Sequence, residues 1–347
     1  MELQVGISGE GTAKALAYPA LVGRPQVGDE VLLNTTALAM GLGTGGYAMV
    51  VAIPDRLPPD PTGPGHLVKA RYTPLQATLL GADEQDSPHH ALLADADSLD
   101  GMPVIVADLH SALPPILAGL LAERPGTRVV YVMPDGGALP AWFSMSIAQL
   151  KAAGALAATV TVGQAFGGDL EAVTVHTGLL AARLVLEADA VVLAQGPGNL
   201  GTGTRWGFSG VSAGEAVNAA AVLSGRPVGS LRVSEGDARE RHQGVSHHSL
   251  TAYGRVALAS ADIPVPVLPG AFGAKVRDQT ALLTGHTLVE IPVDGLEQIL
   301  REAEKDWGVR LSTMGRRLDA DLPYFLTTAA AGRHTAHLLN AEDAPSA

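Results

Sequence analysis

The sequence predicts an α/β protein in which a mostly parallel, doubly wound sheet follows a small all-β domain. From Gly101 onward, short apolar runs alternate with longer helical patterns, which is the order of βαβ units. Before residue 80, short apolar runs are separated by Gly, Pro, Asn and Asp turns, as in small barrels and sandwiches. We therefore expect a β-barrel-like domain at 1–80, a linker at 81–100, a Rossmann-like domain at 101–341 and a loose tail at 342–347.

Composition limits the classes of function. The chain has 347 residues, no cysteine and a formal net charge of −12. The lack of cysteine excludes disulfides, thiolate metal sites and cysteine nucleophiles, and the lack of a clustered basic face disfavours a nucleic-acid groove. The first residues do not have the pattern of a secretory signal, and apolar stretches are interrupted before the roughly 20 residues of a membrane span. We expect a cytoplasmic protein that binds neither nucleic acid nor membranes.

The strands of the N-terminal domain are predicted from apolar runs between turn residues. A glycine cluster, Gly41–Tyr47, is interpreted as a flexible hairpin turn, with a ligand-lining loop as the alternative. The acidic and polar composition of residues 81–100 favours a linker, so a metal site at His89 and His90 is not expected. The strands expected before the linker are 3–7, 14–18, 30–33, 48–53 and 67–72.

The C-terminal domain alternates buried strands with helices. Pro264, Pro266 and Pro269 interrupt the run at 263–268 and demote it to an edge strand or a connector. Ser212 and Glu215 have the spacing of a helix capping box. The other expected strands are 103–107, 128–133, 157–162, 190–194, 228–233 and 286–293, and the expected helices are 111–123, 139–154, 169–187, 212–224 and 295–307, with further helix beyond 311.

Polar residues collect directly after successive strands. The carboxyl ends of parallel strands share one edge of a sheet, and ligands bind in the crevice there. The segments that precede the strands offer mainly ordinary turns, so the two edges differ in chemistry. We therefore expect one crevice lined by the segments 108–111, 134–137, 163–169, 195–204 and 234–248.

The stretch Ala190–Ser212 is central to this prediction, because a buried strand leads into a glycine loop and then a helix. Residues 196–201 match G-x-G-x-x-G, but further glycines delay the helix, and Glu215 at the expected acidic position is better explained as a cap. A phosphate or carboxylate is favoured over a dinucleotide, with tight packing of the loop as the alternative. The predicted contacts are Gly196, Gly198, Gly201, Thr202, Gly203 and Thr204.

Two acidic segments are candidates for catalysis or metal binding. Asp108 and His110 have a spacing at which metal hydrolases often present two ligands after a strand. A helix cap is the alternative for Asp108. Gly167 and Gly168 are predicted to contact substrate, and Asp169 to act in acid–base chemistry, although a carboxylate also stabilises a helix start by itself.

The segment 237–248 carries the densest chemistry in the chain. Its imidazoles can relay protons or bind a metal if a turn at Gly244 brings them to one face, and its guanidinium groups can clamp an anion. A salt-bridged helix followed by a turn is the alternative. The residues concerned are His242, His247, His248, Arg239 and Arg241.

Together these segments predict an enzyme that acts on a small anionic substrate, for example a phosphorylated one, by metal-assisted hydrolysis or group transfer. A serine nucleophile at Ser144, Ser146 or Ser209 is disfavoured because none of these three serines lies in a G-x-S-x-G motif. The cofactor is left open, with a divalent metal ion as the candidate. The alternatives are a non-catalytic metabolite-binding or sensory module, and a structural assembly subunit whose Ala-rich helices pack in a homo-oligomer. The expected catalytic residues are His242, His247, His248, Asp108 and Asp169, and the expected metal ligands are Asp108, His110 and His247.

Six stretches spread over nearly the whole chain are specific when taken together: 28–37, 41–47, 71–76, 163–173, 196–210 and 239–251. On these stretches the chain resembles an uncharacterised bacterial family, Domain of Unknown Function thirty-eight sixty-six. The resemblance implies one integrated protein. It implies no activity, so the function depends on the residues themselves.

Overall fold

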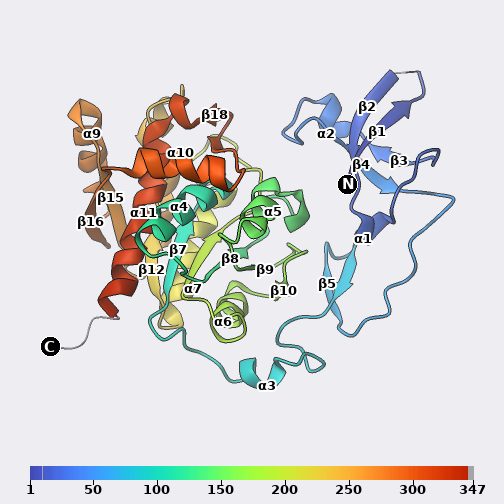
Figure 1. Cartoon of the computed structure of the whole chain (residues 1–347), viewed down its shortest axis with the longest axis horizontal. Coiled ribbons are helices and arrows are strands. Elements are labelled where there is room, and N and C mark those ends of the chain that lie inside the picture. Colours follow the sequence, from blue (N-terminus) through green and yellow to red (C-terminus); the bar gives the residue numbers. More distant parts are fainter. Residues whose placement is uncertain (10, 343–347) are drawn as a thin grey trace. The chain divides into compact units, whose positions relative to one another are not determined.

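The computed structural model describes residues 1–9 and 11–342 and divides the chain after Leu80 into two units (Figure 1). Within these residues, no helix combines the length and the apolar character needed to cross a bilayer. The tail expected at 342–347 lies outside the described residues, apart from the backbone of Glu342 at the end of the last helix.

The first unit contains a small mixed sheet in the order β1-β2-β4-β3 and a separate β5–β6 hairpin. The pair β2–β4 is parallel, whereas β1–β2 and β3–β4 are antiparallel. In the described part of this unit β1 and β3 are the outer strands, so the predicted small β-domain is an open sheet. The elements are β1 (Glu2–Ile7), β2 (Gly11–Leu16), α1 (Pro19–Val22), β3 (Leu32–Asn34), α2 (Thr36–Ala39), β4 (Ala48–Ala52), β5 (Leu67–Lys69) and β6 (Ala77–Leu79).

The second unit is built on an eight-stranded parallel sheet in the order β10-β9-β8-β11-β7-β12-β15-β16. This confirms the predicted α/β fold. Every residue of β7, β8 and β11 is buried, as expected of central strands covered on both faces. Because β11 lies between β8 and β7, the chain reverses its direction across the sheet here, and such a reversal opens a crevice at the carboxyl ends. The strands are β7 (Pro103–Ala107), β8 (Val129–Met133), β9 (Ala158–Thr161), β10 (Leu170–Glu171), β11 (Ala190–Ala194), β12 (Arg226–Gly229), β15 (Asp262–Val267) and β16 (Thr287–Pro292).

Helices cover both faces of this sheet (Figure 1). Helices α4, α10 and α11 pack together on one face, where α11 contacts β7, β12, β15 and β16. Helices α6 and α7 pack on each other and on β7, β8, β9 and β12. The helices are α3 (His90–Leu93), α4 (Leu113–Glu123), α5 (Met145–Ala152), α6 (Val175–Leu184), α7 (Ser212–Val222), α8 (His247–Thr251), α9 (Gly270–Thr280), α10 (Leu296–Asp306) and α11 (Leu322–Glu342), and two short strand pairs are β13 (Val233–Ser234) with β14 (Gly244–Val245) and β17 (Ser312–Thr313) with β18 (Arg316–Arg317).

Three local features differ from the sequence-based expectations. Residues 81–100 belong to the second unit, because Leu93 and Leu99 are buried in its core. The Ser212 hydroxyl donates to the carbonyl of Ser209 and does not cap α7. The proline-rich strand β15 is internal: it pairs along its length with β16, but with β12 only at Asp262. Pro264 and Pro266 are two residues apart, so they remove N–H donors on one side of the strand only.

Candidate functional site

Three imidazoles meet at the carboxyl end of the sheet. His242 ends a 3₁₀ turn that begins at Glu240, and His247 and His248 open α8. One ring nitrogen from each lies within 4.8 Å of the others. The ring centroid of His242 is 5.0 Å from that of His247 and 5.0 Å from that of His248, and the centroids of His247 and His248 are 4.5 Å apart. We call His242, His247 and His248 the histidine group.

The local chain explains why these residues converge. The antiparallel β13–β14 pair folds the segment into a loop, and Gly244 takes the left-handed backbone (φ 75°) that favours glycine. Ser246 is the N-cap of α8: its hydroxyl oxygen accepts from the backbone N–H of His248 and lies 2.7 Å from Nδ1 of His242. One buried hydroxyl therefore holds two members of the histidine group.

A buried charged pair lies beneath His248. Asp108 follows β7, Arg232 follows β12, and the two residues are 5% and 2% exposed. Oδ2 of Asp108 is 3.4 Å from Nδ1 of His248, and Nη1 of Arg232 is 3.2 Å from the same nitrogen. Among the described residues, neither Oδ2 of Asp108 nor Nη2 of Arg232 has a hydrogen-bond partner. Such unsatisfied buried groups are uncommon and indicate a functional or exchangeable contact.

The surroundings pack against His248 and keep His242 and His247 neutral. The ring of Phe208 stacks on His248 with centroids 3.8 Å apart and planes inclined by 4°. Burial and then the charge of Arg232 lower the pKa of His242 to about 3, and burial and then His248 lower the pKa of His247 to about 4. Near neutral pH both rings are therefore uncharged and have a lone pair available for a proton or a metal ion.

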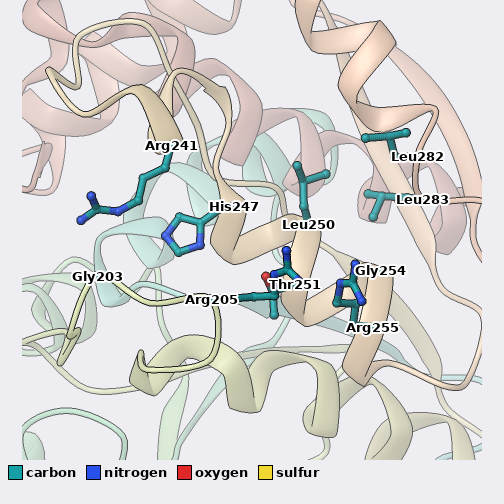
Figure 2. Close-up of a pocket in the computed structure, with 10 residues that line it drawn as sticks. All are labelled: Gly203, Arg205, Arg241, His247, Leu250, Thr251, Gly254, Arg255, Leu282 and Leu283. Atoms are coloured by element: carbon teal, nitrogen blue, oxygen red, sulfur yellow. The ribbon is translucent and has the colours of Figure 1, made fainter.

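A cavity of about 700 Å³ lies against the histidine group through His247 (Figure 2). Three arginines from separate segments and no acidic residue line it within the described structure. Arg205 comes from the glycine loop, Arg241 from the loop before α8, and Arg255 from the π-helical turn that follows α8. The described residues form no ion pair with any of these arginines. The full lining is Gly203, Arg205, Arg241, His247, Leu250, Thr251, Gly254, Arg255, Leu282 and Leu283.

Comparison with known proteins identifies the family. Residues 14–332 match the family model described as "Protein of unknown function (DUF3866)". The chain belongs to this family. Searches of curated proteins and of solved structures find no match to this DUF3866 chain, so its function is inferred from the geometry of its own site.

In this family member the glycine loop is a turn closed by its own hydrogen bonds. Gly201 and Phe208 form an antiparallel bridge. The hydroxyls of Thr202 and Thr204 lie 3.2 Å apart; Thr202 also donates to the carbonyl of Gly207, and Thr204 accepts from the Gly207 N–H. Of the six residues predicted to hold an anion, Gly203 lines the arginine cavity. The loop also places Arg205 in the lining of that cavity and Phe208 against His248; neither contact was predicted from the sequence.

The structure places Gly167, Gly168 and Asp169 beside β9 and β10, where their hydrogen-bond and ion-pair partners lie outside the histidine group. Asp169 pairs with Lys151 at 2.5 Å and accepts from the backbone N–H of Thr159 at 2.8 Å. Gly167 donates to Glu171, and Gly168 to Thr161. The chain turns back after β9 so that β10 can pair with it in parallel, and this return carries Asp169 to a position beside Thr159, near the start of β9.

His110 and Arg239 are also engaged outside the histidine group. The His110 ring lies 2.9 Å from the Tyr131 hydroxyl and 2.7 Å from that of Ser144, and burial lowers its pKa to about 4. It lines a separate cavity of about 240 Å³ together with Gly196 and Gly198. Arg239 forms a two-pronged pair with Asp237. Of the predicted metal ligands, only His247 belongs to the histidine group, and Asp108 adjoins it.

Proposed function

We propose that this protein is an enzyme that binds a small anionic substrate, such as a phosphorylated molecule, in the arginine-lined cavity and catalyses its hydrolysis or group transfer. The observation that carries the proposal is that His247 belongs both to the histidine group and to the wall of this cavity. A reacting group bound to the arginines would therefore lie against an imidazole.

The charge of the cavity selects the substrate class. Three guanidinium groups in a lining that holds no acidic residue favour an anion with more than one negative oxygen, because each can donate two parallel hydrogen bonds. Leu250, Leu282 and Leu283 give the same cavity an apolar side. A phosphate ester with an apolar portion fits both halves of this lining.

The neutral imidazole of His247 supplies the chemistry. The lone pair of a neutral His247 can take one of two roles: it can accept a proton from an attacking water or hydroxyl, or it can hold a metal ion that lowers the pKa of that water. In the first role, a bound dianion would raise the pKa of His247 towards neutrality. The arginines would stabilise negative charge that develops on the transferred group. This division of roles gives a reason for three arginines and His247 to line the same cavity.

Replacing Arg241 with Ala is expected to weaken the binding of inorganic phosphate or pyrophosphate about 10–100-fold, because hydrogen bonds to a charged group contribute about 1.5–3 kcal/mol. Isothermal titration calorimetry on the full chain measures this change. Arg310→Ala is the matched control, since Arg310 is exposed and does not line the cavity. Equal affinities of the two variants, or no anion binding by the wild type, would contradict the proposal.

Turnover is tested with p-nitrophenyl phosphate and a panel of phosphate esters by measuring phosphate release. We expect release by the wild-type chain and its loss in His247→Ala. Anion binding with no turnover of any ester would instead support a sensory module.

A further inference from the structure

Two rings of the histidine group, those of His242 and His247, each have a nitrogen with no hydrogen-bond partner among the described residues. Nδ1 of His242 is engaged by Ser246, so Nε2 of that ring remains available. Nε2 of His247 is buried and has no hydrogen-bond partner among the described residues. Leaving such a nitrogen unpaired in a desolvated place is unfavourable unless a further species binds it.

We propose that His242, His247 and His248 together bind one divalent zinc-like metal ion. Tetrahedral zinc with Zn–N bonds of 2.0–2.1 Å requires nitrogens about 3.3 Å apart. Because the present separations are within 4.8 Å, shifts of less than about 1 Å per ring would bring them to that distance. A set of three imidazole nitrogens favours zinc over magnesium or calcium, which take oxygen ligands.

Asp108 acts as the positioning residue for this centre. A metal ion on Nε2 of His248 requires the proton to be on Nδ1. That proton would be donated to Oδ2 of Asp108, which is 3.4 Å away and has no hydrogen-bond partner among the described residues. Without metal, the Arg232 guanidinium 3.2 Å from Nδ1 can donate to it instead. Metal binding would therefore change the tautomer of His248 and satisfy the buried Asp108 oxygen, as in carboxylate–histidine–metal arrangements.

Three protein ligands would leave one coordination position open, and His247 places the centre against the arginine-lined cavity. An open position is the mark of a catalytic zinc site, where the ion lowers the pKa of a bound water or polarises a substrate oxygen. In this catalytic sense the inference rests on the proposed function. The binding of zinc itself does not depend on that function, and it can be measured without any substrate.

The test is a zinc titration of the full-length protein after chelator treatment and dialysis, with calorimetry for affinity and elemental analysis for stoichiometry. We expect one zinc ion per chain. His247→Ala should lower the affinity more than about 100-fold, and Asp108→Asn about 10–100-fold, the usual effect of an outer partner. His176→Ala is the control, because His176 is exposed and outside the group.

Folding and metal loss are separated by two further measurements. Circular dichroism should show that His247→Ala, a change at a half-buried position, keeps the wild-type fold, and His242→Gln offers a second variant that preserves volume. Substituted cobalt should give the intense visible absorption of a tetrahedral site in the wild type and not in either variant. No zinc binding by the wild type, or equal binding by His247→Ala and His176→Ala, would overturn the inference.

The two proposals fail separately. If zinc binds but Arg241→Ala retains wild-type phosphate affinity, the metal centre stands and the anion site is wrong. If phosphate binding depends on Arg241 but zinc does not bind, the anion site stands and the metal centre is wrong.

Discussion

Replacing Arg232 with Ala is expected to lower the free energy of unfolding by about 3–5 kcal/mol, the usual cost of removing one partner from a buried charge pair. Arg232 is 2% exposed and lies 3.9 Å from Asp108 and 3.7 Å from Asp237. Asp237 would keep Arg239 and Arg316 as partners. Asp108 would lose its nearest permanently charged partner while remaining buried. Urea unfolding followed by circular dichroism measures the change.

Two controls isolate the buried charge. Arg301→Ala removes a guanidinium that is 47% exposed from its pairs with Glu297 and Asp319. It should lower the free energy of unfolding far less than Arg232→Ala does, because exposed pairs contribute little. Arg232→Met with Asp108→Asn removes both charges and should be more stable than Arg232→Met alone. A loss for Arg232→Ala no greater than that for Arg301→Ala would show that the buried pair does not stabilise the fold.

The central strands could be predicted from the sequence because burial on both faces leaves a continuous apolar run. Pro103–Ala107 and Ala190–Ala194 were predicted with the bounds that the structure gives them. The strand order could not be predicted. The insertion of β11 between β7 and β8 depends on which faces of distant helices fit together, and no local pattern records this. Likewise, the prolines of β15 led to the prediction of an edge strand or a connector where the structure has an internal strand. The sequence did not show which neighbouring strand would face the side of β15 that lacks N–H donors.

The predictable part of the site lay within single segments. The density of imidazoles at 242–248 predicted a group, and Gly244 supplies the turn that it needed. The partners that other segments supply could not be predicted from the sequence. Arg205 lines the cavity from the glycine loop, and Arg255 lines it from the π-helical turn. Asp169 shows the limit of assuming that every residue after a strand lies at the same edge, since the return to β10 carries it beside Thr159.

Replacing Gly332 with Ala is expected to destabilise the second unit by about 3 kcal/mol, at the upper end of the usual cost of overpacking. Helices α4 and α11 approach each other backbone to backbone: a Cβ at Gly332 would overlap the carbonyl oxygen of Ile116 and lie 2.8 Å from the backbone nitrogen of Leu120. A backbone atom cannot rotate away as a side chain can, so the helices would have to separate along a face where α11 covers four strands of the sheet.

This cost should outweigh the roughly 1 kcal/mol by which Ala normally favours a helix over Gly. Gly119→Ala on the facing helix tests the same contact, because its Cβ would meet the carbonyl of Ala329. Gly285→Ala is the matched control, since nothing lies within 4 Å of the added carbon, and it should change stability by no more than about 0.5 kcal/mol. Thermal and urea unfolding measure all three variants. If Gly332→Ala unfolds at the wild-type midpoint, the two helices can separate freely, and close packing of α11 against α4 is not what holds it over the sheet.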